Sequence, residues 1–288
     1  MKWTLFTFFF VFSLLTTRPS SATEMVGALS AGMGGTGRAS SESIQSLYLN
    51  PAGLGLVEKF YFGAGYQNGF LGKDISRHSY GINFTDGTDG VILPGSLGYR
   101  NHNITEGSQE FKENEFKGGF GYRITPRLSI GAAYTYLDGE DSFGGEHKQH
   151  NVDLGVLVGL MPNWGFSISG ENLLKGDEKL PTALKRSSRV ALGTQAIFKN
   201  IIVTRYEVLS TLYVEENQLL TNRFGLGILL KSKFMLNLGY SVDDLSEQNW
   251  SSAGLVWKGP RLKLAYSIQS EDRQQLGNRH LVDLWMDL

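Results

Sequence analysis

The stretch Phe234-Met235-Leu236-Asn237-Leu238-Gly239-Tyr240-Ser241-Val242 carries two rows of side chains that differ in character. One row is apolar and the other is mostly small or polar: Phe234, Leu236, Leu238, Tyr240 and Val242 against Met235, Asn237, Gly239 and Ser241. A period of two indicates a β-strand with one apolar face. Strands of about ten residues with such faces are typical of barrels that cross a membrane, with lipid on one side and a lumen on the other.

The same alternation recurs along the chain from about residue 58 onward. It predicts fourteen strands, at 58–67, 75–85, 90–100, 114–124, 127–138, 147–160, 163–172, 186–198, 201–213, 219–231, 233–243, 249–258, 261–270 and 279–288. The connections alternate in length: tight turns such as Thr125-Pro126 and Gly259-Pro260 separate longer polar stretches such as 101–113 and 173–185. Outer-membrane barrels place short turns in the periplasm and longer loops outside, and an even number of strands returns both termini to the periplasm. We therefore predict an all-β fold, a 14-stranded antiparallel transmembrane β-barrel over residues 58–288.

The composition agrees with a large β structure and excludes several other classes of protein. The 288 residues include 41% hydrophobic side chains, 36 Gly and no Cys, with a net charge of −1. This hydrophobic content excludes disorder, the absence of Cys excludes disulfides and thiolate metal sites, and the charge gives no indication of nucleic-acid binding. A secreted β-sandwich or propeller is the alternative, but its second face would be strongly polar, whereas Gly, Ala and Ser dominate here.

The row opposite the apolar face also carries scattered charges. On the barrel interpretation these side chains face the lumen: Arg77, Arg123, Asp153, Glu171, Arg205, Glu207 and Asp283.

Both ends of the chain indicate export to a bacterial outer membrane. Residues 1–22 have a cation at Lys2, an apolar run at 5–15 and small residues before Ala22, which together predict a cleaved signal peptide. At the other end, Val282, Leu284, Met286 and Leu288 form an apolar row that reaches the last residue. It resembles the final strand that the barrel-insertion machinery reads in outer-membrane proteins, with Leu in place of the usual Phe.

Residues 23–57 do not alternate, and they contain a motif of a different kind. Formally, Gly32, Gly34 and Gly37 match a dinucleotide-binding fingerprint, but no strand precedes them and no βαβ unit follows. A short helix is expected next, ending before Pro51. The residues of the motif are Gly27, Ala28, Ala31, Gly32, Met33, Gly34, Gly35 and Gly37, followed by Tyr48, Asn50, Pro51, Ala52 and Gly53. This pattern resembles the N-terminal signature of FadL/PorV-like outer-membrane proteins, the long-chain fatty acid transporter-like superfamily.

The resemblance implies that residues 23–57 fold inside the barrel as a plug or hatch. It also implies passive uptake of small hydrophobic molecules, such as fatty acids or aromatic compounds. Members of this kind have a kink in the third strand that opens the wall toward the bilayer. In this chain Pro94 falls within the predicted third strand, so we expect an unpaired lateral gate at Pro94-Gly95.

PorV-like relatives imply a second role, as a non-transporting component of a secretion or surface-assembly system. The short loops favour it, because FadL-like proteins build their outer capture site from long ones. The expected partners are outer-membrane lipid and lipopolysaccharide, the insertion machinery, a hydrophobic small molecule or secretion-system proteins, and no nucleic acid. We expect no enzyme, cofactor or metal, because no Ser motif adjoins a His and the pair His147 and His150 has no evident third ligand.

Overall fold

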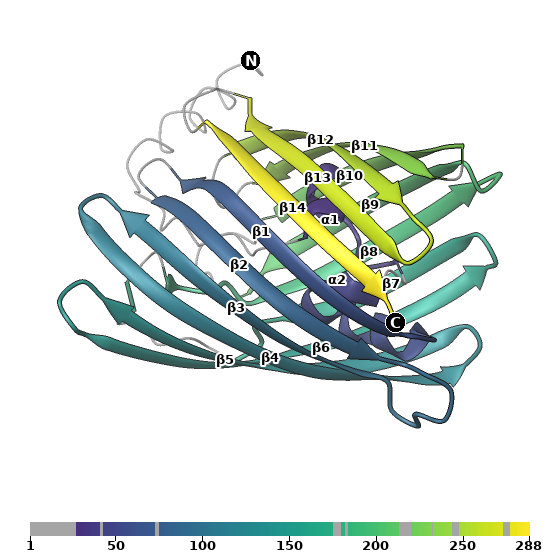
Figure 1. Ribbon diagram of the computed structural model, residues 1–288, viewed down its shortest axis with the longest axis horizontal. Helices are drawn as coiled ribbons and strands as arrows, with labels where there is room; N and C mark the ends of the chain where they lie inside the picture. Colours follow the sequence, from purple (N-terminus) through teal and green to yellow (C-terminus); the bar gives the residue numbers. More distant parts are fainter. Residues whose placement is uncertain are drawn as a thin grey trace, which may run out of the picture.

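The computed structural model contains one closed barrel of fourteen antiparallel strands, which confirms the predicted fold class. It describes residues 27–40, 43–72, 75–174, 180–181, 184–212, 220–231, 233–243, 248–272 and 277–288. The strands are β1 (Phe60–Gly72), β2 (Ile75–Asp86), β3 (Gly95–Glu106), β4 (Gln109–Thr125), β5 (Leu128–Asp141), β6 (Glu146–Met161), β7 (Trp164–Glu171), β8 (Arg189–Phe198), β9 (Ile202–Thr211), β10 (Leu220–Leu230), β11 (Phe234–Asp243), β12 (Gln248–Lys258), β13 (Leu262–Glu271) and β14 (Asn278–Asp287). Each strand pairs with its neighbours in the sequence, and the ring of tilted strands is visible in Figure 1.

The last strand closes the ring by pairing with the first. The β1–β14 ladder runs from Tyr61 opposite Asp287 to Asn68 opposite His280. Closure satisfies the backbone of every strand within the sheet, which is the condition for β structure in a lipid bilayer. The closed ring also excludes the sandwich and the propeller.

The two rows of side chains lie on opposite sides of this wall. In β11, Phe234, Leu236 and Leu238 point outward and are exposed, whereas Met235 and Asn237 are buried on the lumen side. The other strands repeat this arrangement, with exposed aromatic and aliphatic side chains outside. Because a surface this apolar would be unstable in water, it indicates a barrel whose outer face contacts lipid.

The N-terminal segment, residues 27–57, lies inside the ring (Figure 1). It consists of α1 (Ala28–Gly32), α2 (Ser43–Leu49) and the 3-10 helix η1 (Pro51–Leu56). The helix α1 packs on β11–β14, and η1 packs on β3–β6. Nearly all of the described side chains in this segment are buried, so the segment fills the lumen rather than covering an end of the barrel.

The barrel has two ends, which we call the near end, where β1 begins and β14 ends, and the far end. Most of the longer connections lie at the far end as expected, but residues 87–94 form a long connection at the near end. The predicted loop at 101–113 is wrong: β3 and β4 continue as a ladder to the pair Glu106–Gln109, and Gly107 turns the chain at a φ of 60°. In this hairpin the outward row is polar, with Asn101, Asn103 and Lys112. The reason is that the hairpin extends beyond the band of exposed apolar side chains that contacts lipid.

The position predicted for Pro94 inside the third strand is also wrong. The strand β3 begins at Gly95, which pairs with Asp86 on one side and Phe120 on the other. Pro94 lies just outside, at the end of the near-end connection 87–94, where a residue without an N–H ends the β3–β4 ladder. The predicted gap is therefore not at Gly95. The predicted signal peptide, 1–22, lies outside the described residues. No helix in the described part of the chain is long and apolar enough to cross a membrane.

Candidate functional site: the lumen and the N-terminal segment

The glycine motif forms a tight turn that follows α1 and lies directly against the wall. Gly34 and Gly35 have φ angles of 71° and 82°, in the left-handed region that glycine adopts without strain. The Gly34 N–H donates to Ser252 Oγ of β12 at 3.0 Å. On the wall, a Cβ at Gly225 or Gly239, which pair across β10 and β11, would collide with the backbone of Met33 and Gly34. Glycines on both sides therefore permit backbone-to-backbone contact.

The apolar side chains of α1 and Met33 pack in a cluster with inward residues of four strands. Its buried members are Ala28, Leu29, Ala31, Met33, Met235, Val256, Ala265, Leu281 and Trp285. Ser252 Oγ lies 3.3 Å from Gly32 O, so this face of the motif is also joined to β12 through a hydroxyl. The cluster stabilises the first half of the N-terminal segment by burial of apolar surface.

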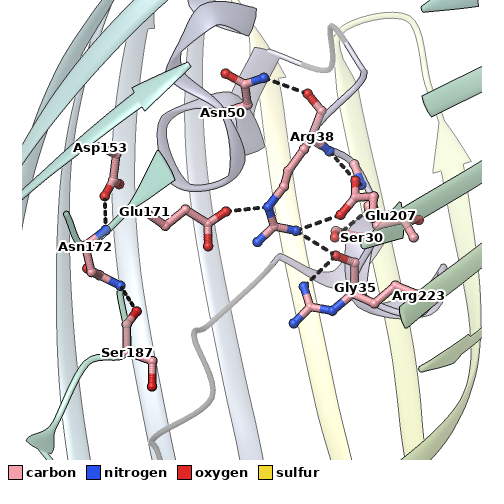
Figure 2. A network of polar contacts seen from close by, with 12 residues as sticks. Ser30, Gly35, Arg38, Asn50, Asp153, Glu171, Asn172, Ser187, Glu207 and Arg223 are labelled. Carbon is pink, nitrogen blue, oxygen red and sulfur yellow. Dashed lines mark hydrogen bonds and ion pairs between the residues drawn. The ribbon is translucent and has the colours of Figure 1, made fainter. Parts of the chain in front are cut away.

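Arg38 joins the N-terminal segment to two strands through a buried ion-pair network (Figure 2). Its Nε donates to Glu171 of β7, and its Nη1 donates to Glu207 Oε2 of β9 at 2.7 Å. Glu207 Oε1 also accepts from the backbone N–H groups of Gly37 and Arg38, each at 2.6 Å. All three charged side chains are 1% exposed, so two carboxylates receive their compensating charge from the N-terminal segment.

The motif Asn50-Pro51-Ala52 begins η1 and fixes it against the opposite wall. Asn50 Oδ1 accepts from the Ala52 N–H at 3.1 Å, as an N-cap does, and Asn50 Nδ2 donates to Arg38 O at 2.9 Å. Ser129 Oγ of β5 donates to Ala52 O at 2.6 Å. A Cβ at Gly131 would collide with the backbone of Pro51 and Ala52, so η1 lies directly on β5. Gly53 follows in η1 and is buried.

Tyr48 occupies the centre of the lumen between α2 and β3. The Arg100 guanidinium carbon lies 3.2 Å from the centroid of the Tyr48 ring, and Lys117 Nζ lies 5.5 Å from it. A Cβ at Gly98 would overlap the Tyr48 hydroxyl, so the ring fits against β3 only because residue 98 is glycine. Burial raises the pKa of the Tyr48 phenol above its ordinary value, and the ring is therefore neutral at physiological pH.

At the far end, described residues of the connection after β7 lie against the inner face of β2–β4. Leu184 packs in a buried cluster with Ile75, Ile104 and Phe111. Arg186 Nη2 donates to Glu113 of β4 and lies 3.7 Å from Glu115 Oε2. These contacts bring Leu184 and Arg186 into the lumen beside the N-terminal segment.

All of the predicted lumen charges except Arg123 are buried. Glu171 and Glu207 bind Arg38, as described above. Asp153 accepts from Lys117 Nζ and from the Asn172 N–H, and Asp283 accepts from the Ala28 N–H at 2.5 Å and from Gln45 Nε2 at 3.3 Å. Arg205 Nε donates to Gln195 at 2.7 Å, and Arg77 is buried in β2.

Arg123 differs from these, because it lies at the near-end rim. Its side chain is 39% exposed, and it donates to Gly55 O and to Glu58, each at 3.3 Å.

Sequence reasoning missed several residues that matter most in the lumen. Arg38 is the only Lys or Arg between residues 23 and 57, and this isolation in a glycine-rich stretch is a signal that could have identified it. Arg100 and Glu115 lie within the predicted strands 90–100 and 114–124, on the same row as their inward neighbours Gly98 and Lys117, so the alternation was the signal that could have placed them in the lumen.

The structure assembles no evident metal site or catalytic cluster in the part that it describes. Among these residues, no group of three or more His, Asp and Glu side chains is placed to hold a metal ion. His147 lies 3.3 Å from Asp141, whereas His150 contacts Tyr134 on the outer face, so the two imidazoles do not converge.

These features define a class: a 14-stranded transmembrane β-barrel whose lumen is occupied by its own N-terminal segment. No family model and no curated protein matches the chain. Among solved structures, the chain is similar to the CymD monoaromatic hydrocarbon channel, with a TM-score of 0.72, 11% identity, and coverage of 91% of this chain and 97% of CymD. For the Pseudomonas putida toluene transporter TodX, the TM-score is 0.68 at 12% identity, covering 93% and 99%. For a Pseudomonas aeruginosa FadL homologue, it is 0.64 at 10% identity, covering 92% and 98%.

At these identities the comparison establishes the fold. The chain has the fold of FadL-type outer-membrane barrels over nearly its whole described length, as its N-terminal motif indicated.

Proposed function

We propose that the protein is a bacterial outer-membrane channel for passive uptake of small hydrophobic molecules, such as fatty acids or aromatic compounds. The similarity to aromatic hydrocarbon and toluene channels supports this function. In this proposal the N-terminal segment is the hatch of the channel, because it fills the lumen and is attached mainly through contacts that can be broken and re-formed.

The observation that carries the proposal is the stagger between the ends of β3 and β4 at the near-end rim, which we call the notch. The β3–β4 ladder ends at the pair Gly95–Phe120, and one further bond joins Gly121 N to Pro94 O at 2.9 Å. The strand β4 continues to Thr125, where it pairs with β5. The last residues of β4 therefore extend past the end of β3.

The notch is apolar outside and faces the N-terminal segment inside. Ile92, Leu93 and Tyr122 are exposed on the membrane side. On the lumen side, a Cβ at Gly55 of η1 would overlap Tyr122 N and C. A hydrophobic molecule leaving the lumen here would enter lipid without crossing water, so we propose the notch beside Pro94 and Gly95 as the lateral gate.

Uptake of labelled long-chain fatty acid and labelled toluene, by cells with and without the gene, tests the function. Pro94→Val tests the gate, because Val supplies the N–H that allows β3 to extend along β4 and narrow the notch. We expect uptake to need the gene and to fall in Pro94→Val. The matched control is Pro260→Val, in the near-end turn between β12 and β13, which should leave uptake unchanged.

A second candidate is a non-transporting, PorV-like component of a secretion or surface-assembly system. The charged lumen favours it, because ion pairs such as Lys117 with Asp153 give a hydrophobic molecule no apolar path past the N-terminal segment. Equal uptake with and without the gene for both compounds would support this role. Retention of an exported protein at the cell surface only when the gene is present would then test it.

A further inference from the structure

Two small cavities meet at one aromatic ring in the lumen. The cavity toward β14 is lined by Gln45, Tyr48, Asn83, Arg100 and Asp283, among others, and has a volume of about 30 Å³. The cavity toward the far end is lined by Tyr48, Arg100, Glu115, Lys117, Thr135 and Arg186, among others, and has a volume of about 20 Å³. A water molecule needs about 10–15 Å³ measured in this way, so both cavities can hold water.

Tyr48 and Arg100 are the two residues that line both cavities. The guanidinium carbon lies 3.2 Å from the ring centroid, and the ring is seated against Gly98. The stacked pair therefore separates two small spaces, each lined in part by charged side chains. Since the ring belongs to α2 and not to the wall, movement or removal of one side chain would join them.

The charges along the far-end cavity are mainly positive. Arg100, Lys117 and Arg186 line it together with one carboxylate, Glu115. Lys117 pairs with Asp153, and Arg186 pairs with Glu113 and, at 3.7 Å, with Glu115, so Glu115 is the only one of these three carboxylates that lines the cavity. On the other side of the ring, Asp283 accepts hydrogen bonds from Ala28 N and Gln45. Pores lined by Arg and Lys select for anions.

We propose that the lumen contains an aqueous route for small inorganic anions along β2–β5, closed by Tyr48 stacked on Arg100. The route is separate from the apolar notch at the near-end rim, which lies beside Pro94 and is faced by η1. It does not depend on hydrophobic uptake, because charged side chains line both cavities and its barrier is a different side chain.

Conductance of the purified full-length protein in planar lipid bilayers tests the route. Wild type and Tyr48→Phe retain the ring and should show low chloride conductance. Tyr48→Ala should raise the conductance severalfold, and its reversal potential in a KCl gradient should show a preference for chloride over potassium. No rise in Tyr48→Ala, or a preference for potassium, would overturn the proposal.

Two further variants separate loss of the ring from general loosening of the N-terminal segment. Met33→Ala weakens the packing of α1 on the opposite wall, and we expect low conductance. If the conductance of Met33→Ala rose as much as that of Tyr48→Ala, the proposal that Tyr48 closes the route would be overturned. Because the chain has no other Cys, Tyr48→Cys can be modified at this position alone. The unmodified variant should conduct chloride. Benzyl methanethiosulfonate, which attaches a benzyl ring to the thiol through a reducible disulfide, should lower the conductance again. Conductance that the reagent does not change would contradict the proposal.

Discussion

The two halves of the N-terminal segment are attached to the wall by different physical means. Residues 27–40 use side chains: an apolar cluster around Met33, and the ion pairs of Arg38. Residues 45–57 use contacts between η1 and wall glycines such as Gly131, a hydrogen bond from Ser129, and apolar packing of Leu47 and Leu54 against Ala133. Asn50 joins the halves through its bond to Arg38 O.

This difference indicates which half is the more strongly attached. An ion pair buried at 1% exposure is costly to break, since separation leaves charges without partners in a poorly solvated space. Backbone contacts on glycine and single hydrogen bonds contribute about 1 kcal/mol each. The η1 half also lies behind the rim notch, so the more weakly attached half is the one that faces the proposed gate.

The largest effect is expected for Arg38→Ala. Removing one partner of a buried ion pair typically costs about 3–5 kcal/mol, and here Glu171 and Glu207 both lose their shared cation. Residues 27–40 should become sensitive to protease, measured as cleavage rate in detergent micelles, while the circular dichroism of the barrel stays unchanged. Arg38→Lys, which keeps the buried cation, should recover part of the resistance. Unaltered cleavage in Arg38→Ala would show that the ion pairs do not anchor this half.

A medium effect on protease sensitivity is expected when a larger side chain replaces a glycine of the wall that contacts one half of the N-terminal segment. Gly239→Val forces a Cβ against Gly34, and Gly131→Val forces one against Pro51 and Ala52. Overpacking of this kind costs about 1–3 kcal/mol. Mapped cleavage sites should lie within 27–40 in the first variant and within 45–57 in the second. Release of the whole segment in both variants would mean that Asn50 couples the halves into one unit.

The smallest effect is expected for Arg123→Ala. This side chain is 39% exposed at the rim and donates to Gly55 O at 3.3 Å, so water can replace its contacts. Exposed ion pairs contribute less than about 1 kcal/mol. The thermal unfolding midpoint and the cleavage rate should both remain close to wild type. A loss as large as that of Arg38→Ala would show that the η1 half depends on this contact.

Most of the wall could be predicted because alternation is a local property. Each of the fourteen strands overlaps its predicted range, since the lipid selects every second side chain within one strand. The β3–β4 hairpin was missed where its outward row becomes polar beyond the apolar band, at Asn101 and Lys112. Pro94 was misplaced because a proline marks the end of a ladder as well as a bend within one.

The lumen was predicted only in part. The alternation along a strand shows which side of the wall a charged side chain faces, but not which residue it contacts. Asp153, Glu171, Glu207 and Asp283, which the alternation places on the inner row, are buried in the structure. Their partners come from segments distant in sequence: Arg38 is 133 residues from Glu171 and 169 from Glu207. Such pairings depend on the diameter of the ring and on the path of the N-terminal segment.

The sequence by itself determined the number of strands, the side of the wall on which most residues lie, and the glycine motif. These features follow from the residue types that are adjacent along the chain and from their alternation with a period of two. Only the tertiary structure decided that Arg38 bridges β7 and β9, that Tyr48 stacks on Arg100, and that β3 begins at Gly95, paired on both sides, while β4 continues to Thr125. The physical reason is closure: a ring of strands brings together side chains that are far apart along the chain, and a local pattern does not encode those distances.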